Sequence, residues 1–299
     1  MVASGPAGPR RRLGAELRRL RTGAGLHLDQ VADQLQCSTS KISRLETGKG
    51  IPKPADVREL IRIYDVAADS ERDMLLRLVR ESRTEGWWES YTDGVAPERF
   101  VLDVQQRYTA LEVDASAIRG YDPAILHGLL QVPAYSRAVM GLLLPHHAPQ
   151  DIEQLVELRA RRQEALTERD PPLELVLVLD EAVLRRPVGG AGVMTNQLSA
   201  LLEFSELPAV ALHVLPFAAG LHRVQLGRFD ILEFPDESVP DVVYVEGHAG
   251  ETYLENPSDV DLYKDVLADA VDHALAPEAS RALIARHLDK YATSRRAPR

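Results

Sequence analysis

The segment Gly25–Gly48, with the sequence GLHLDQVADQLQCSTSKISRLETG, decides how the N-terminal part of the chain folds. It contains two stretches, 28–36 and 40–46, in which apolar residues recur at the spacing of a helix with one buried face. These residues are Val31, Ala32 and Leu35 in the first stretch and Ile42 and Leu45 in the second. Ser38 or Thr39 is a suitable N-cap for the second stretch. The segment therefore predicts two short helices joined by a tight turn.

Helical spacing continues on both sides of this segment. Leucines recur at spacings of four and three from Arg10 onward, until Gly23 and Gly25 end that pattern. Two more helices are expected, one beginning at Pro54 and one over 70–82. Residues 10–83 are therefore predicted to form an all-α domain of five short helices. Residues 1–9 are rich in Gly, Ala and Pro, and we expect them to be a disordered lead.

The same segment resembles the lambda-repressor-like helix-turn-helix family, also called XRE. Val31-Ala32 stands where the two helices cross closely, and SRLETG at 43–48 matches the family's ending, in which the glutamate, here Glu46, is usually structural. The sequence departs from the family at Gln36, where the turn usually has glycine. It departs again at Leu28, where many members carry a polar phosphate-binding residue. The resemblance implies a DNA-binding domain whose second motif helix enters the major groove.

The polar residues in and around the second motif helix are the candidate DNA contacts. A helix fits the major groove, where side chains near its N-terminus meet base edges. The residues expected to contact bases are Thr39, Ser40, Lys41, Ser43 and Arg44. Arg44 is the candidate for a bidentate contact with guanine. The residues expected to contact phosphates are Arg18, Arg21, Ser38, Lys49 and Lys53. For each cation the alternative is a solvated surface residue.

The charge of the chain is unevenly distributed. The chain has 35 Lys and Arg and 45 Asp and Glu, for a net charge of −10, which by itself disfavours nucleic acid as a partner. Residues 1–83 hold 16 basic and 11 acidic residues, a net of +5, and residues 84–299 hold 19 and 34, a net of −15. Only the N-terminal part is therefore expected to attract an anionic partner.

Cysteine content and hydropathy indicate the cellular compartment in which the protein is expected. The single cysteine, Cys37, cannot form an internal disulfide, and it lies in the turn of the motif. We expect it to be a small packed residue, with a redox-sensing role as the alternative. No apolar run approaches the ~20 residues that cross a bilayer. These features favour a cytoplasmic protein associated with the nucleoid, with no membrane partner.

Residues 84–292 are predicted to form a second domain of the α+β class. β-type runs are expected at 173–179, 210–215, 228–234, 241–246 and 251–254. Helices are expected at 100–115, 133–145, 149–169 and 196–206, then one from Pro257 and one over 277–291, with a loop at 94–97. Because most of the strands follow one another directly, the sheet of about five strands should be largely antiparallel, flanked by helices. Residues 293–299 are expected to be a flexible tail.

A second resemblance covers nearly all of residues 84–290. It rests on short motifs: GWW at 86–88, YDP at 121–123, GLLQ at 128–131, DEAVLRRPVG at 180–189 and YVEG at 244–247. Together they resemble a large domain of unknown function that follows an XRE-type domain in many actinomycete regulators. Such regulators are often encoded beside a very small partner protein, in an antitoxin-like arrangement. The resemblance thus implies regulation and a protein partner, and no chemistry.

No motif for catalysis stands out in the second domain. The chain has no Gly-Lys-Ser/Thr phosphate loop, no Gly-x-Ser-x-Gly and no His-Glu-x-x-His. The glycines at 189–192 are expected to form a turn, and His146-His147 point apart, so no cofactor and no metal site is predicted. Trp87 and Trp88 are expected to anchor the start of the second domain, with the wall of a ligand or partner pocket as the alternative. His222 is a further candidate for lining such a pocket.

Two function classes fit these observations. The first is a sequence-specific transcriptional regulator that binds double-stranded DNA as a homodimer, because one recognition helix reads only about five or six base pairs. In it, the second domain would serve dimerisation and regulation by a partner or ligand. The second is an antitoxin-like interaction protein that binds the small product of a neighbouring gene and regulates its own promoter. An enzyme with an attached DNA-binding domain is disfavoured by the absent motifs.

Overall fold

The computed structural model describes residues 7–92, 106–236, 239–247 and 250–296. The chain divides near Glu89 into two compact units, and each is described by itself. The N-terminal unit extends to Glu89, and the C-terminal unit begins at Ser90. The loop expected at 94–97 and the first part of the helix expected at 100–115 lie outside the described residues.

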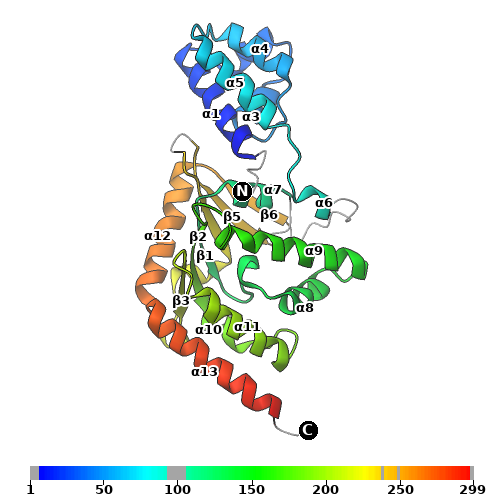
Figure 1. Ribbon diagram of the computed structural model, residues 1–299. Helices are drawn as coiled ribbons and strands as arrows, with labels where there is room; N and C mark the ends of the chain where they lie inside the picture. Colours follow the sequence, from blue (N-terminus) through cyan, green and yellow to red (C-terminus); the bar gives the residue numbers. More distant parts are fainter. Residues whose placement is uncertain (1–6, 93–105, 237–238, 248–249, 297–299) are drawn as a thin grey trace. The chain divides into compact units, whose positions relative to one another are not determined.

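The N-terminal unit is the all-α domain that the sequence predicts (Figure 1). Its helices are α1 (Ala7–Gly23), α2 (Leu28–Gln34), α3 (Thr39–Glu46), α4 (Pro54–Ile63) and α5 (Asp69–Glu81). Their apolar faces form one core, which includes Leu13, Leu17, Val31, Ile42, Val57 and Leu75. A short helix, α6 (Glu89–Thr92), follows the domain. The five-helix prediction is confirmed.

Helix α1 begins earlier than the sequence indicates. It starts at Ala7, so residues 7–9, expected in the disordered lead, are helical. The reason is that Pro9 falls in the first turn, where the missing N–H costs no hydrogen bond. Residues 1–6 lie outside the described part of the chain.

Helix α1 packs unusually close to the end of α3. A Cβ added at Gly14 would lie 2.6 Å from the carbonyl oxygens of both Leu45 and Glu46. Backbone atoms at that distance cannot give way cheaply, so only glycine fits here. Gly14 therefore fixes how the last turn of α3 sits in the domain.

The turn between α2 and α3 has left-handed backbone at Gln36, whose φ is +50°. This is the position at which the family pattern has glycine, the residue that adopts such a φ without steric cost. The departure seen in the sequence is thus accommodated by strain at one residue, and the helix-turn-helix geometry is kept.

The C-terminal unit contains a sheet flanked by helices. Its strands are β1 (Ala117–Asp122), β2 (Glu174–Asp180), β3 (Val210–Leu215), β4 (Phe229–Glu233), β5 (Val242–Gly247) and β6 (Gly250–Leu254). Its helices are α7 (Gln106–Asp114), α8 (Pro133–Leu143), α9 (Pro149–Arg162), α10 (Glu181–Arg185), α11 (Ala191–Phe204), α12 (Pro257–His273) and α13 (Pro277–Arg296). The single-turn 3-10 helices are η1 (Gly128–Leu130), η2 (Gln163–Leu166), η3 (Phe217–Ala219) and η4 (Arg223–Leu226).

The six strands have the order β3-β2-β1-β4-β5-β6. Strands β1, β2 and β3 run parallel, and β1-β4, β4-β5 and β5-β6 pair antiparallel. The fold class and the largely antiparallel sheet are confirmed, and all five predicted strands are present. The sixth strand, β1, lies in the middle of the sheet and is missing from the sequence prediction.

Helices cover both faces of this sheet. On one face α12 packs along β1 to β5, around Tyr121, Val178, Phe229 and Ile231. On the other face a larger core joins the sheet to α7, η1, α11 and α13 (Figure 1). Helix α11 begins at Ala191, five residues before the predicted start, and α13 continues to Arg296, into the expected tail.

Candidate functional site

One side of helix α3 is buried in the domain core, and its other side is polar. Ile42 and Leu45 are buried in the domain core. The hydroxyl of Ser38 caps the helix by accepting a hydrogen bond of 3.2 Å from the N–H of Lys41, as the sequence predicts for this position. The start of the helix, where base contacts are expected, is thus fixed relative to the core.

The outer side of α3 carries the predicted base-contacting residues. Thr39, Ser40 and Arg44 are exposed, and Ser43 is half-buried. Thr39 and Ser43, and likewise Ser40 and Arg44, are four residues apart, so they lie one above the other on the helix surface. These four side chains form one polar patch, which we call the α3 face.

Lys41 lies beside this face and has an intramolecular partner. Its ammonium group is 2.7 Å from Asp56 Oδ2, and its side chain is 38% exposed. To contact a base, Lys41 would have to leave this ion pair, which at such exposure contributes only a small stabilisation. Lys41 therefore lies on the exposed side of α3, but its ammonium group is paired with Asp56.

Arg21 forms hydrogen bonds within the N-terminal domain. Its guanidinium donates from Nε and Nη2 to the two carboxylate oxygens of Glu46, at 2.6 and 3.0 Å, and from Nη1 to the carbonyl of Leu26. The hydrogen bonds to Glu46 raise the pKa of Arg21. The side chains of Arg21 and Glu46 are only 12% and 5% exposed. The expectation of a phosphate contact by Arg21 is therefore corrected: this group is used to tie α1 to the end of α3.

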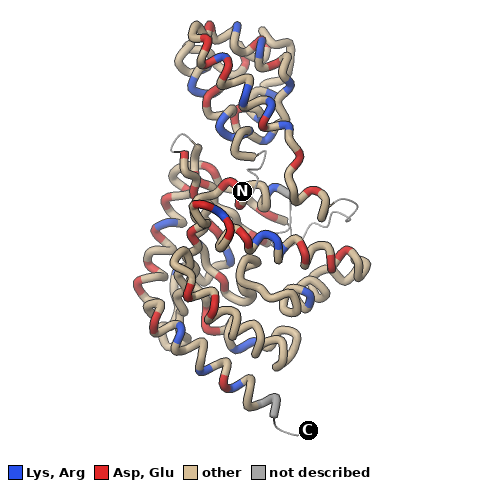
Figure 2. Tube along the Cα trace, in the orientation of Figure 1, with Lys and Arg blue, Asp and Glu red and all other residues tan. Residues whose placement is uncertain are grey.

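The other predicted phosphate-contacting residues are at the surface. Arg18, Lys49 and Lys53 are exposed, as is Ser38. Basic residues are interspersed with acidic ones along the N-terminal unit (Figure 2). The only acidic residue of α3, Glu46, is turned inward. The α3 face and these cations therefore form the candidate nucleic-acid interface.

The C-terminal unit contains a second candidate site, a buried polar network on one face of the sheet. In the strand register Gly120 of β1 pairs with Asp230 of β4, and Asp230 pairs with Tyr244 of β5. Two residues further along these strands lie Asp122 of β1 and Glu246 of β5. Arg228, just before β4, donates to both carboxylates: its Nε is 3.2 Å from Asp122 and its Nη1 is 2.7 Å from Glu246. Its third nitrogen, Nη2, is 3.1 Å from Asp230. One arginine thus bridges carboxylates of three strands.

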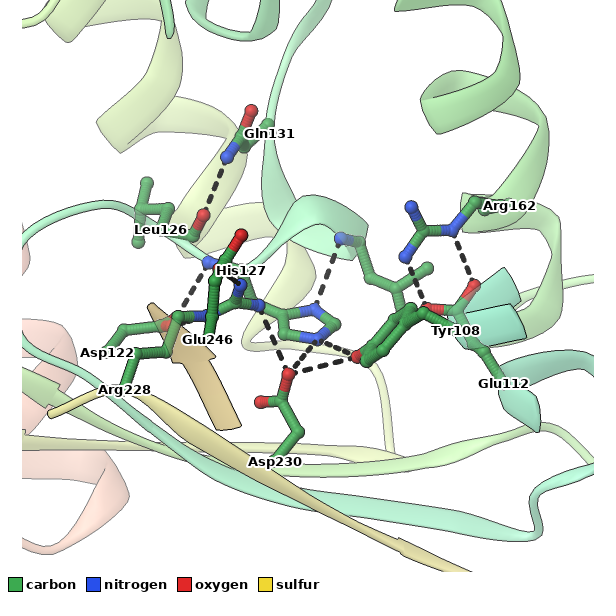
Figure 3. A network of polar contacts seen from close by, with 11 residues as sticks. Tyr108, Glu112, Asp122, Leu126, His127, Gln131, Arg162, Arg228, Asp230 and Glu246 are labelled. Carbon is green, nitrogen blue, oxygen red and sulfur yellow. Dashed lines mark hydrogen bonds and ion pairs between the residues drawn. The ribbon is translucent and has the colours of Figure 1, made fainter. Parts of the chain in front are cut away.

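His127 lies at the centre of this network, between Tyr108 and Asp230 (Figure 3). Its Nδ1 accepts from the N–H of Leu129 at 3.2 Å, so Nε2 carries the proton of the neutral ring. Nε2 is 2.9 Å from the hydroxyl of Tyr108, which donates to Asp230 Oδ2 at 3.0 Å. His127 and Asp230 are fully buried. The network is thus a chain of oriented hydrogen bonds, closed to solvent.

The pKa values of the two aspartates of the network are shifted in opposite directions. Burial raises the pKa of Asp122 to about 6, although Arg228 and His127 act in the opposite direction. The pKa of Asp230 is lowered, because attraction to Arg228 and His127 and the hydrogen bonds from His127 and Tyr108 outweigh its own burial. Gly120 makes room for Asp230, since a Cβ there would lie 2.4 Å from its Oδ1. Both carboxyls are therefore placed by the strand register.

The network continues into the segment that follows β1. The N–H of His127 donates to Asp122 Oδ2 at 2.6 Å, and Gln131 Nε2 donates to the carbonyl of Leu126 at 2.6 Å. Gln197 of α11 accepts from Val132 N–H and donates to the Leu130 carbonyl. In the segment 122–132, backbone N–H and carbonyl groups that are not paired within a strand or a long helix form hydrogen bonds with these side chains instead. The motifs YDP and GLLQ of the second resemblance lie in and beside this segment, and Asp122, Leu130 and Gln131 of these motifs take part in its hydrogen bonds.

Two arginines of α9 extend the buried polar groups further. Arg162 and Glu112 form a bidentate pair at 2.6 Å, with side chains 0% and 2% exposed, beside the ring of Tyr108. Arg159 donates to Gln131 at 2.7 Å. No local pattern in the sequence marks Tyr108, His127, Arg228 or Asp230 as a site, because they come from separate segments that only the fold brings together.

An open groove lies on the α12 side of the C-terminal unit. Its volume is about 620 Å³, and most of its lining is apolar, including Val224, Phe229 and Val266. Leu221, Leu226 and Leu262 also line it and are 90%, 98% and 51% exposed. His222, the candidate pocket residue, is among the lining residues. The two other candidates are elsewhere: Trp87 and Trp88 lie in the N-terminal unit, in edge-to-face contact at 5.9 Å, and Trp88 is 1% exposed.

Comparison with known proteins identifies both parts of the chain. A family model described as a helix-turn-helix domain matches residues 12–75. A second model, described as a domain of unknown function (DUF5753), matches residues 105–286. Comparisons with curated proteins and with solved structures found no match. Within the described residues, no helix has both the length and the apolar character needed to cross a membrane.

Proposed function

Because the chain belongs to the family defined by the domain of unknown function DUF5753 and carries a helix-turn-helix domain, we propose that it is a sequence-specific transcriptional regulator. The observation that carries this proposal is the α3 face. Its polar side chains project outward from a helix whose other side is locked into the core, while the acidic residue of that helix is turned inward. This is the arrangement by which a recognition helix presents donors and acceptors to base edges.

In this proposal α3 enters the major groove and the residues around it set its position. Thr39, Ser40, Lys41, Ser43 and Arg44 contact base edges, with Arg44 bidentate to a guanine. Lys41 does so after leaving Asp56. Arg18, Ser38, Lys49 and Lys53 contact phosphates, which fix the register without reading sequence. No step of this function requires a cofactor or a catalytic group, and its place in the cell is the nucleoid.

We propose that DNA is bound by a homodimer. A single α3 face reads about five or six base pairs, which is too few to select one site in a genome. Two copies related by a twofold axis would read two half-sites about one helical turn apart. Footprinting on the DNA upstream of the protein's own gene tests this, because a dimer protects two half-sites with that spacing and a monomer protects one.

The substitution Arg44→Ala tests the role of α3 directly. We expect it to weaken operator binding by about 1–3 kcal/mol, or roughly 5- to 150-fold, and to relax the preference for guanine at one position of each half-site. The matched control is Arg77→Ala on α5, an exposed arginine that pairs with Glu81 in the N-terminal unit and lies outside the interface. Equal affinity of the wild type and Arg44→Ala in a mobility-shift titration would refute the assignment of the recognition helix.

A second candidate function, binding of a small protein partner encoded by a neighbouring gene, is favoured by the exposed groove. Leu221 and Leu226 project almost fully into solvent beside the apolar lining of the groove, and a contiguous exposed apolar surface of this kind marks an interaction site. The adjacent helix α12 carries exposed Asp261, Asp265 and Asp272, so a partner segment with an apolar face and basic flanks would suit it. Such a partner would make the C-terminal unit the regulatory input to DNA binding.

Co-purification of the full chain with that small protein tests the second function. We expect Leu226→Asp to abolish the complex and leave DNA binding intact, because Leu226 is 98% exposed and contributes little to the fold. The control is Leu142→Asp, an exposed leucine of α8 that does not line the groove. Loss of the complex in both variants, or in neither, would rule out the groove as the docking surface.

A further inference from the structure

Three potential metal ligands from two segments meet beside the groove. His222 precedes η4, and Asp269 and His273 are one turn apart on α12. The potential ligand atoms of the three side chains all lie within 4.8 Å of one another. The two imidazole rings have their centroids 4.8 Å apart. In the sequence His222 and His273 are far apart, which is why spacing alone gave no sign of this cluster.

Each histidine is anchored through one ring nitrogen. His222 Nε2 is 2.8 Å from the carbonyl oxygen of Ala219, and His273 Nδ1 is 2.7 Å from that of Asp269. A carbonyl only accepts, so these nitrogens carry the protons, and the opposite nitrogen of each neutral ring keeps its lone pair. Metal-binding histidines have this same arrangement, with one N–H held by a backbone carbonyl or carboxylate and the other nitrogen on the metal.

The electrostatic surroundings favour a cation. His273 is the last residue of α12, where the free carbonyl groups of a helix carry partial negative charge. Asp265 and Asp272 on the same helix are exposed and add negative charge. The one lysine of α12, Lys264, is paired with Asp241 at 2.7 Å. The positive charge of Arg223, next to His222, opposes the binding of a cation, but this side chain is exposed to solvent.

We propose that His222, Asp269 and His273 form a binding site for a divalent transition-metal ion of the Zn²⁺ class. Two imidazoles and one carboxylate are ligands that Zn²⁺ prefers over Ca²⁺ or Mg²⁺, and water would take the fourth position. Ligand atoms in such a tetrahedral site lie about 3.3 Å apart at metal–ligand distances of about 2.0–2.1 Å. The side chain of Asp269 is 35% exposed, so its carboxylate can rotate to close the remaining distance while both histidines keep their backbone hydrogen bonds.

The bound ion would connect the two sides of the groove. His222 belongs to the loop that supplies Leu221 and Leu226, and α12 supplies Leu262 and Val266. A metal held by residues of both segments fastens the loop to the helix. The cation thereby sets the width of the groove, which makes it a regulatory input to this surface.

A zinc titration of the full chain, freed of metal with a chelator, tests the proposal. Competition against a chromogenic Zn²⁺ chelator should show one equivalent of bound Zn²⁺, and His222→Ala and His273→Ala should each weaken binding at least tenfold. Zinc-edge X-ray absorption of the wild type should show two imidazole ligands. His146→Ala, which removes an exposed histidine from another loop of the same unit, is the matched control and should bind as the wild type does.

Two further measurements keep the result decisive. Cys37→Ser should retain the bound equivalent, since a zinc thiolate elsewhere in the chain would be lost in that variant. Circular dichroism should show native helix content for His273→Ala, because that side chain is half exposed. Absence of a stoichiometric Zn²⁺ equivalent in the wild type, or equal affinity in the wild type and His273→Ala, would overturn the proposal. Neither result bears on DNA binding by α3.

Discussion

Arg21 shows how far residue types alone can mislead. In the sequence it is one of several arginines beside a DNA-binding motif, and any of them suits a phosphate. In the fold it is directed at Glu46 and the Leu26 carbonyl, and solvent reaches little of either side chain. The difference comes from packing between α1 and α3, which periodicity within one helix does not report. Glu46, by contrast, has the structural role that the family resemblance implies.

We expect Arg21→Ala to destabilise the N-terminal unit by about 3 kcal/mol, because it leaves the Glu46 carboxylate buried without its charge partner. Denaturant unfolding followed by the tryptophans of that unit measures the effect. Arg19→Ala is the control, since Arg19 is 58% exposed and its ion pairs with Glu16 and Glu71 should together contribute less than about 1 kcal/mol. An unchanged stability together with a weaker dependence of DNA binding on salt would restore Arg21 as a phosphate contact.

Asp122 makes a pH-dependent contribution to the C-terminal unit. Its pKa is about 6 in the folded protein against an ordinary value of 3.8, so the stability linked to it is complete below pH 4 and is lost as the pH rises through 6. The difference corresponds to about 3 kcal/mol. Asn at this position cannot ionise. Asp122→Asn should therefore gain stability relative to the wild type between pH 4 and pH 7.

Differential scanning calorimetry over that range follows the unfolding transition of the C-terminal unit. The control is Asp265→Asn, which changes an exposed carboxylate of α12. A constant difference in stability between Asp122→Asn and the wild type at every pH would mean that Asp122 ionises as freely in the fold as in the unfolded chain.

At the scale of elements, the closest helix contact of the N-terminal unit is decided by Gly14. Gly14→Ala should cost about 1–3 kcal/mol, because its methyl group meets the Leu45 and Glu46 carbonyl oxygens and must push α3 away from α1. Thermal unfolding measures this loss. Gly23→Ala, at the end of the same helix with no atom within 4 Å, should be neutral. An equal response of the two variants would contradict the tight α1–α3 contact.

The strand that the sequence does not reveal, β1, illustrates the limits of pattern reading. Its residues AIRGYD include an arginine, a glycine and an aspartate, which interrupt the apolar alternation of a strand. The contacts that place these polar residues in a strand are made with neighbouring strands, so they exist only once the sheet has formed. Arg119 pairs with Glu174 of β2 and Glu233 of β4, and Gly120 leaves space for Asp230. Strands β2 to β5 contain apolar runs long enough to be recognised locally, and the shorter β6, with the sequence GETYL, is also predicted.

The whole molecule combines a basic unit and an acidic one. The N-terminal 83 residues have a net charge of +5 and the remainder −15, so a chain with a net charge of −10 still offers one cationic region. The five-helix domain with its helix-turn-helix and the α+β class of the second domain follow from local periodicity and from family motifs. The buried network, the groove and the cluster at His222 do not, because each is built from segments distant in the sequence.

The dependence of DNA binding on salt tests the central claim most directly. Six basic residues of a dimer, namely Arg18, Lys49 and Lys53 of each copy, would neutralise about six phosphates and release their counterions. The logarithm of the association constant for the DNA upstream of the protein's own gene should then fall with the logarithm of salt concentration with a slope of about −5. That DNA should also bind more tightly than a scrambled sequence at every salt concentration. A slope near zero, or equal affinity for the two sequences, would contradict the assignment of the chain as a sequence-specific DNA-binding regulator.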